Sequence, residues 1–408
     1  MANYDQIRAY FQQSEALQAT VRRAASVPLV QGFTLDVDPL WSLFYDIENG
    51  LADWPTEDGW RTREWRDLFD HPHLLFRYAY ETDFLYRLRF RAAHRYQGYR
   101  SRDLHKEVKS WTMLQEELGS RRSSPMIMTV VHRPLRGSEQ EGRNEESDDQ
   151  AQLRTLVGLI RESAVPVRLE ERPVARLAFA AGDGIQSTNK RSGTLGGVLQ
   201  DSRAKKSYGV TCAHVAASGD IIHDSSGAFV GSCTADTAPV ALSSGTVCDP
   251  VNLAVPNPSP GNGPDLNMLD SALIDLAIPI TMPQLAGVAK SLSPGQNVTI
   301  SGASTGITRH KLGSLCLSYS FNQGGQDFCF RDAIEIWPVS WAPFGGPLGH
   351  MMSTLPTQGD SGAWVLTDDQ PAYWAGVFFG EDGYRGFAIR GSWVHSWAEK
   401  SVGSSLTV

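Results

Sequence analysis

The first third of the chain repeats apolar residues at intervals of three and four positions, which is the spacing of one helix face. The repeat is clearest in three groups: Ile7, Tyr10 and Phe11; Leu40, Leu43 and Phe44; and Phe84, Leu85 and Leu88. Strand-like alternation of apolar and polar residues is scarce before about residue 118. We therefore predict a mainly α-helical domain over residues 1–118, with helices ending or bending before Pro55 and Pro72.

The next stretch, residues 119–152, is polar and dense in charge. Such a composition buries too little apolar surface to fold by itself. We interpret the stretch as a linker or exposed loop, although a short β-rich run from Met126 to Val131 lies inside it.

The sequence predicts a helix over residues 151–162. After it the pattern changes to short predicted strands that are separated by Gly, Asn, Asp, Ser and Pro. The clearest strands span residues 165–169, 174–178 and 193–199, and a helical segment at 394–400 lies near the end. Many short strands with turns between them are typical of a β-barrel or a sandwich. The predicted fold class is α+β overall, with the mainly helical domain followed by an all-β domain over residues 153–408.

The charge of the chain limits the partners that we expect. A net charge of -8 gives no global attraction to nucleic acid or to an anionic membrane. Basic and aromatic residues interleave from Arg87 to Lys106, but solvated helix faces have the same composition. The many aromatic residues between positions 39 and 97 fit a small helical core. We expect residues 1–118 to recruit or regulate through a protein partner, and we expect no nucleic-acid partner.

The N-terminal sequence and the cysteines indicate in which cellular compartment we expect the protein. Residues 1–18 contain no continuous apolar stretch of the kind that a secretory signal requires, and no run of about 18 apolar residues occurs elsewhere. The cysteines are odd in number and show no CxxC spacing. This pattern argues against a disulfide framework or a zinc site. We therefore expect a soluble cytoplasmic protein that uses no metal and no organic cofactor.

Three segments of the β region carry groups that can act together in catalysis. They contain His214, Asp270 and Ser361, in that order along the chain. A serine hydroxyl becomes a nucleophile at neutral pH when an imidazole takes its proton and a carboxylate holds the tautomer of that imidazole. Glycines flank Asp360 and Ser361, so a tight turn there can point the amides of Gly359 and Ser361 at the oxyanion of a tetrahedral intermediate.

These segments resemble motifs of the trypsin-like (chymotrypsin-fold) serine peptidases. The run Thr-Cys-Ala-His214 is similar to the Thr-Ala-Ala-His segment of that family, and Gly359-Asp-Ser-Gly matches its nucleophile turn. The segment Asp270-Ser-Ala-Leu-Ile-Asp-Leu resembles the family's aspartate strand, which selects Asp270. The resemblance covers roughly residues 150 to 400, and the sequence around Gly193 looks closest to intracellular bacterial and plant narrow-leaf-type members. It implies a double β-barrel endopeptidase that acts on proteins or peptides through an acyl-enzyme.

The same resemblance implies a substrate pocket. Phe378, Phe379 and Gly380 stand where the family has the strand that pairs with the substrate backbone, and Leu355 stands at the base of the specificity pocket. An apolar base leaves a buried Lys or Arg of the substrate without a counter-charge, so we expect an apolar or small residue at the cleavage site. Glu381 and Asp382 follow directly and could attract a basic residue at the pocket mouth.

Secreted relatives order the nucleophile turn with a freshly cleaved apolar N-terminus, which pairs with the acidic residue before the serine. No Arg followed by Ile-Val-Gly-Gly precedes the barrel in this sequence, and no cysteine adjoins His214 or Ser361. Asp360 therefore needs another partner or none, and the fold must stand on packing alone. We expect no trypsin-type zymogen activation.

Several alternatives remain open from the sequence. His223 and His350 are other candidate bases, and Asp265 and Asp275 are other candidate carboxylates. The chain could also be a catalytically silent scaffold that binds through this fold. An esterase of the α/β-hydrolase type is disfavoured, because Ser361 lacks the flanking Gly-x-Ser-x-Gly pattern and the order His, Asp, Ser differs from that of the α/β-hydrolases.

Overall fold

The computed structural model describes residues 3–37, 126–135, 148–163, 167–177, 184–189, 191–250, 262, 267–280, 284–338 and 355–408. The chain forms two compact units. The first is built from described residues between Gln6 and Arg172, and the second from Asn3–Asp5 and the described residues from Pro173 onward. Among the described helices, none combines the length and apolar character that crossing a bilayer requires.

The first unit combines helices with a small sheet. Its elements are α1 (Tyr4–Gln13, whose first two residues group with the second unit), α2 (Glu15–Ala25), α9 (Asp148–Arg161), β1 (Val30–Val37), β2 (Met126–His132) and β3 (Val167–Glu171). β2 pairs antiparallel with β1 and parallel with β3. Every residue of β2 is buried, so this strand is the centre of the sheet. Ser14 caps α2 by accepting a hydrogen bond from the Leu17 N–H at 3.3 Å.

The first unit differs from the sequence prediction in three places. The predicted mainly helical domain contains strand β1, and the rest of that prediction, over residues 38–118, lies outside the described residues. The predicted linker contains the buried strand β2 and the start of α9, because a short apolar run can join a sheet whatever the charge of its neighbours. The strand expected at 165–169 appears as β3 and pairs in the first unit, so the unit with the remaining strands begins at Pro173 and not at residue 153.

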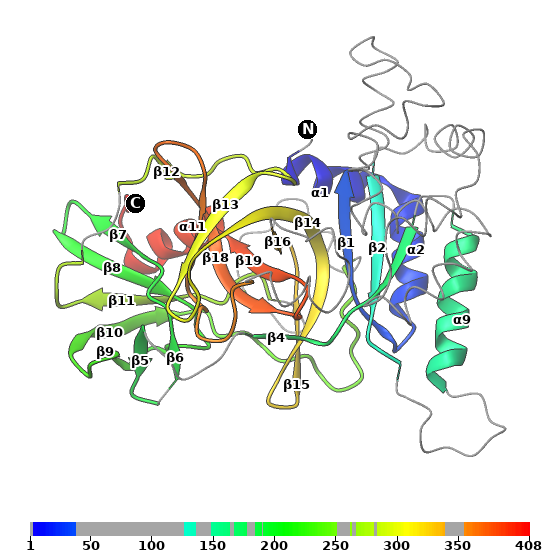
Figure 1. The fold of residues 1–408 in the computed structure, drawn as a ribbon, viewed down its shortest axis with the longest axis horizontal. Helices are drawn as coiled ribbons and strands as arrows, with labels where there is room; N and C mark the ends of the chain where they lie inside the picture. The colour runs from blue at the N-terminus through cyan, green and yellow to red at the C-terminus, as the bar shows by residue number, and fades with distance from the viewer. Residues whose placement is uncertain are drawn as a thin grey trace, which may run out of the picture. The chain divides into compact units, whose positions relative to one another are not determined.

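The second unit is mainly β (Figure 1). One of its sheets is seven-stranded and runs in the order β6 (Ser192–Gly193), β5 (Ile185–Ser187), β9 (Ile221–Asp224), β10 (Phe229–Asp236), β11 (Ala272–Leu276), β8 (Lys206–Thr211) and β7 (Gly197–Asp201). All of its pairings are antiparallel.

The other strands of this unit close on themselves. The ring runs β13 (Asn297–Gly302), β17 (Trp364–Thr367), β18 (Tyr373–Glu381), β19 (Gly386–Arg390), β16 (Ala333–Pro338) and β14 (Gly306–Gln323), and β14 pairs again with β13. Short strands attach to this ring: β4 (Ala175–Leu177), β12 (Gly287–Val288) and β15 (Gln326–Phe330). The core of the ring includes a cluster of aromatic side chains in contact: Tyr319, Phe321, Phe330, Phe379 and Phe387.

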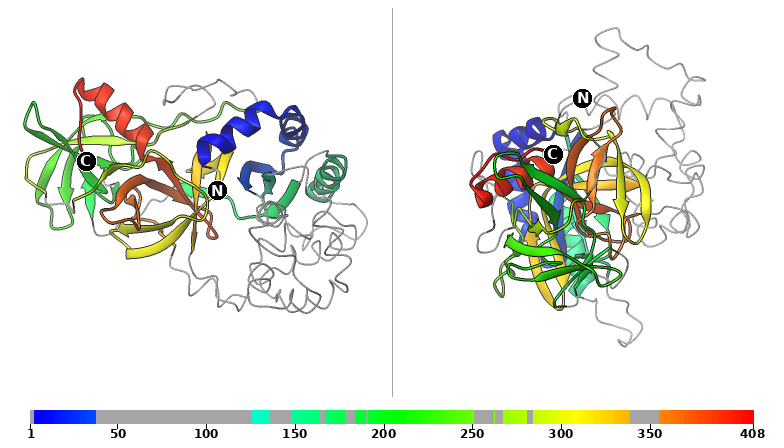
Figure 2. Two further views of the ribbon diagram at one scale, coloured as in Figure 1. Left: turned by 90° about the horizontal axis from the view of Figure 1, so that it is seen from above. Right: turned by 90° about the vertical axis from the view of Figure 1, so that its left-hand side faces the viewer.

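The C-terminal segment joins the two sheets of this unit. Helix α11 (Gly391–Val402), which the sequence predicts at 394–400, contacts β18 and β19. Figure 2 shows this helix, in red, beside the orange strands of the ring. Beyond the helix, Thr407 pairs with Gln200 of β7, and the Ser404 hydroxyl donates to Asp201 at 2.5 Å. The segment therefore contacts the ring and the seven-stranded sheet.

A disulfide overturns the expectation that packing alone holds this unit together. Cys248 and Cys329 are bonded, with their Cα atoms 5.3 Å apart. The bond ties the segment after β10 to β15, while Cys212, Cys233 and Cys316 form no disulfide. The sequence could not reveal the pair, since cysteine pairing follows from spatial proximity and an odd count conceals it. The expected lack of a disulfide was one reason to predict a reducing compartment, and the bond removes that reason.

Removing this bond is expected to lower the free energy of unfolding by about 4.5 kcal/mol, because it closes a loop of 81 residues in the unfolded chain. The measurement is urea unfolding of the Cys248→Ala/Cys329→Ala variant beside the oxidised parent. Cys233→Ala, at a buried free thiol, controls for the loss of a sulfur atom. A double variant no less stable than this control would contradict the prediction.

Candidate active site

The segment around Ser361 is a tight turn anchored on strand β18. Gly359 and Gly362 have φ angles of 94° and 96°, a region that favours glycine. The Gly362 N–H donates to the Phe378 carbonyl at 2.9 Å, and the Phe378 N–H donates to the Ala363 carbonyl at 2.9 Å. A Cβ atom on Gly362 would lie 2.3 Å from the Thr194 carbonyl oxygen, so no other residue fits. The turn therefore holds Ser361 at a fixed place beside β18.

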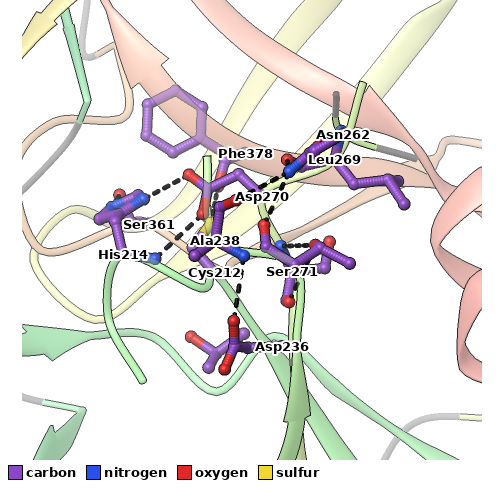
Figure 3. Close-up of polar contacts among 12 residues, drawn as sticks. Cys212, His214, Asp236, Ala238, Asn262, Leu269, Asp270, Ser271, Ser361 and Phe378 are labelled. Atoms are coloured by element: carbon purple, nitrogen blue, oxygen red, sulfur yellow. Dashed lines mark hydrogen bonds and ion pairs between the residues drawn. The ribbon is translucent and has the colours of Figure 1, made fainter. Parts of the chain in front are cut away.

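His214 and Asp270 come together because their strands pair. His214 follows β8, Asp270 precedes β11, and Ala272 of β11 pairs with Thr211 of β8. The His214 N–H donates to Asp270 Oδ1 at 3.0 Å, and His214 Nδ1 bonds to Asp270 Oδ2 in a short contact. On the other side of the ring, His214 Nε2 lies 2.9 Å from Ser361 Oγ (Figure 3). The structure thus brings the three residues singled out by the sequence into one hydrogen-bonded chain.

The site is almost closed to solvent. Asp270 and Ser361 are fully buried, and His214 is only 6% exposed. In such surroundings a hydrogen bond between charged or polar groups is stronger than in water. Burial also prevents water from competing with the His214 imidazole for the carboxylate of Asp270.

The segment that carries Asp270 is fixed by two polar residues nearby. Asn262 accepts hydrogen bonds from the N–H groups of Met268 and Leu269 at 3.0 Å each and donates to the Leu269 carbonyl at 2.8 Å. The Thr237 hydroxyl accepts the Ser271 N–H at 3.0 Å. These contacts, visible in part in Figure 3, set the direction in which Asp270 points.

The other candidates from the sequence lie elsewhere. Asp275 forms an ion pair of 2.6 Å with Lys206 at the partly exposed surface of the seven-stranded sheet. His223 lies on β9, where its Nδ1 is 3.2 Å from the Gly227 carbonyl oxygen and its ring contacts Phe229. Asp265 and His350 lie outside the described residues.

Thr194 supports the nucleophile turn and was missed by the sequence analysis. Its N–H donates to the Ser361 carbonyl at 2.8 Å, and its hydroxyl donates to the Gly359 carbonyl at 2.9 Å. The same hydroxyl accepts the Ala303 N–H at 2.9 Å. The run Gly193-Thr-Leu-Gly was visible as a family-like segment, but nothing in its spacing connects it to a turn 165 residues away.

The carboxylate of Asp360 has hydrogen-bond partners that the sequence alone does not identify. Its Oδ1 accepts the N–H groups of Ser304 at 2.8 Å and Thr305 at 3.2 Å. Its Oδ2 accepts the Thr305 hydroxyl and the Thr357 N–H, each at 2.8 Å. The carboxylate is fully buried. The turn between β13 and β14 therefore supplies the partner that Asp360 needs.

The predicted oxyanion hole rests on the amides of Gly359 and Ser361. The Ala363 N–H donates to the Asp360 carbonyl at 2.9 Å, which fixes the peptide plane that carries the Ser361 N–H, and the Thr194 hydroxyl holds the carbonyl of Gly359 at 2.9 Å. An amide held in this way needs no reorganisation when charge develops on a substrate oxygen.

Cys212 lies beside the histidine and aspartate, close enough for Cys212, His214 and Asp270 to offer ligand atoms within 4.8 Å of one another. Burial, together with the charge of Asp270, raises the pKa of the Cys212 thiol well above its usual range. The thiol donates to the Phe378 carbonyl at 3.4 Å. A metal ligand would have to be the thiolate, and both ring nitrogens of His214 are already engaged. The group fits a metal poorly.

Three of the predicted pocket residues, Phe378, Phe379 and Gly380, lie on β18. The N–H and carbonyl groups of Phe378 are both bonded to the turn that carries Ser361. The Asp382 carboxylate accepts the Tyr384 and Arg385 N–H groups of the turn after β18. Leu355 is half-buried. The ring of Phe379 packs 4.7 Å from that of Phe330 and belongs to the core of the ring of strands.

No family profile and no curated protein matches the chain. It is similar to solved structures of a glutamic acid-specific serine protease that uses a histidine triad in substrate binding, of Cellulomonas bogoriensis chymotrypsin and of Thermobifida fusca protease A. Their identities to this chain are 15%, 13% and 14%, with TM-scores of 0.34, 0.30 and 0.32. They cover 56%, 56% and 53% of this chain, and 98%, 96% and 95% of their own. At these values the similarity assigns no role to any single residue.

Proposed function

We propose that this protein is a serine endopeptidase of the two-barrel type, with Ser361 as nucleophile, His214 as general acid and base, and Asp270 as the residue that orients His214. The observation that carries the proposal is the 2.9 Å contact between His214 Nε2 and Ser361 Oγ, made while Asp270 holds Nδ1. A proton on Nδ1 leaves Nε2 free to accept the proton of the serine hydroxyl.

The proposed reaction has two halves. Ser361 Oγ attacks the carbonyl carbon of the scissile peptide bond while its proton passes to His214 Nε2, and the oxyanion is held by the amides of Gly359 and Ser361. The C–N bond then breaks as His214 returns the proton to the leaving amine, and an acyl-enzyme remains. Water adds to that ester in the same way, its proton passing through His214, and the acid product and free Ser361 are released.

We further propose that the enzyme prefers an apolar or small residue at the cleavage site. Leu355, placed by the family resemblance at the base of the pocket, is apolar and half-buried, and Phe378 beside the nucleophile turn is fully buried. Apolar walls penalise a charged substrate side chain that brings no partner. A peptide library digested by the enzyme and sequenced by mass spectrometry should show few cleavages after Lys or Arg, and a majority after these residues would contradict the preference.

The rival functions are a catalytically silent scaffold and an acyl hydrolase limited to esters. The support for a working site is that Thr194, Thr305 and Asn262 contribute hydrogen bonds to the segments that carry the nucleophile and the aspartate. A regulatory or recruiting role for residues 1–118 through a protein partner also remains a proposal.

Hydrolysis of casein and of a matched pair of substrates, one amide and one ester, tests the function. We expect the parent protein to cleave casein and both small substrates, and Ser361→Ala to cleave none of them. Ser304→Ala, which keeps the backbone N–H that Asp360 uses, serves as a control at a nearby serine. Cleavage of the ester alone would favour the acyl hydrolase, and activity that survives in Ser361→Ala would contradict the proposed nucleophile.

A further inference from the structure

The two edges of strand β18 have different neighbours. One edge pairs with β19 from Gly376 to Glu381. Strand β17 pairs with β18 from Trp374 to Val377, and since β19 already occupies the first edge, β17 must lie on the second. The hydrogen bonds between Phe378 and the nucleophile turn continue this second edge. Ser361 is therefore presented beside one defined edge of β18, just before Phe379.

An extended peptide whose carbonyl reaches Ser361 would run along that same edge. Backbone groups at an open strand edge are a template for adding another strand, and this is a recurrent way of binding peptides. The residues of β18 that follow the nucleophile turn are Phe379, Gly380 and Glu381. Backbone groups alternate between the two edges of a strand, so those of this stretch that face the second edge are available for such a pairing.

The chain's own strand β4 occupies this position. Leu177 pairs with Gly380, and Arg176 with Glu381, in an antiparallel ladder. Because β19 pairs with the same two residues of β18 on the other side, β4 lies on the edge that presents Ser361. The opposite side of β4 pairs with the end of β14, at Phe321 and Asn322.

Two features fit β4 closely to this edge. A Cβ atom on Gly380 would lie 2.6 Å from the carbonyl oxygen of Arg176, so the glycine permits the approach of the β4 backbone. Arg176 stands directly opposite Glu381. Burial raises the pKa of the Glu381 carboxyl, and the Gly383 N–H and the charge of Arg176 act in the opposite direction. Opposite charges at facing positions stabilise a strand pair.

We propose that β4 is a built-in occupant of the peptide-binding edge of β18, and that an extended protein substrate must displace it before the residues that precede its cleavage site can pair with this edge. The inference rests on the proposed function. The closed state of the site agrees with it, since Ser361 is fully buried and some part of the chain must move before a substrate reaches Oγ. Small acyl substrates that need no strand pairing are therefore affected less than long peptides.

Two variants that weaken β4 test the proposal. Leu177→Pro removes a backbone donor from the strand, and Arg176→Glu places two carboxylates opposite each other. For each we would measure kcat/KM on the tetrapeptide amide succinyl-Ala-Ala-Pro-Leu-p-nitroanilide and on the single-residue ester N-acetyl-leucine p-nitrophenyl ester. Matched controls are Val174→Pro, at an exposed residue before the paired strand, and Arg309→Glu, at an exposed arginine of β14.

We expect both variants to raise kcat/KM on the tetrapeptide about tenfold, with a change below about threefold on the ester and in the controls. If Leu177→Pro fails to fold, as thermal melting would reveal, Arg176→Glu alone decides. An unchanged or lower rate on the tetrapeptide would overturn the proposal and make β4 a purely structural strand of the ring. Absence of any hydrolysis in the parent and in every variant would instead overturn the proposed function.

Discussion

Replacing Asp270 by asparagine is expected to lower kcat on the order of 10⁴-fold. The asparagine amide would donate a hydrogen bond to His214 Nδ1, which drives the ring proton to Nε2. That nitrogen, 2.9 Å from Ser361 Oγ, could then no longer accept the serine proton. The bond from the His214 N–H to the other oxygen can persist, so the fold should survive.

Steady-state kinetics on a peptide substrate measure this loss, with circular dichroism to confirm folding. Asp275→Asn provides the matched control, since it changes the same residue type on β11, the strand that follows Asp270, and breaks a partly exposed ion pair with Lys206. We expect the control to stay within about twofold of the parent, because such pairs contribute little. A loss below tenfold in Asp270→Asn would mean that Asp270 does not orient the base.

Replacing Asp360 by asparagine is expected to lower kcat/KM by about 100-fold or more. The Asp360 carboxylate accepts four hydrogen bonds from the segment at 304–305 and from Thr357, and an amide nitrogen at either position would face a donor. The turn would then shift and carry the amides of Gly359 and Ser361 with it, and loss of one oxyanion donor costs about 100- to 1,000-fold in rate. Leaving buried donors unpaired should also lower the free energy of unfolding by about 2 kcal/mol.

Two further variants locate the cause of this effect. Thr305→Val removes only the hydroxyl bond to Asp360, and we expect a loss of about 1 kcal/mol in stability with a smaller loss of activity. Asp368→Asn changes an exposed carboxylate that accepts one hydroxyl bond from Thr299 and should leave both quantities nearly unchanged. If Asp360→Asn kept full activity, the turn at 303–305 would not order the nucleophile.

The sequence predicts the site better where the chemistry is local. His214, Asp270 and Ser361 stand in short runs whose residue types are set by tight turns and strand ends. Each can therefore be picked out from its immediate neighbours in the sequence. The choice of Asp270 over Asp275 agrees with the opposite directions that strand alternation gives to neighbouring side chains, and Asp275 does point to Lys206. The structure of residues 38–118 is not described, so most of the helical prediction stays untested.

Long-range supports could not be predicted in this way. Thr194 and Thr305 are ordinary hydroxyl residues, and their importance comes from carbonyl and carboxylate groups that lie far away in sequence. The strand at 165–169 shows the same limit, because alternation predicts a strand but not the sheet that it joins. The disulfide between Cys248 and Cys329 follows the same rule, since only the folded chain brings these two among the five cysteines together.

Covalent labelling with a fluorophosphonate probe tests the central claim most directly. The probe would be applied to the parent, to Leu177→Pro, to Ser361→Ala and to His214→Ala, and the adduct would be located by mass spectrometry of peptides. We predict one adduct, on Ser361, in the parent and in Leu177→Pro, with none in Ser361→Ala and a strongly reduced rate in His214→Ala. An adduct at another residue, labelling of Ser361 at an unchanged rate without His214, or no adduct in either the parent or Leu177→Pro would contradict the assembled nucleophile and base.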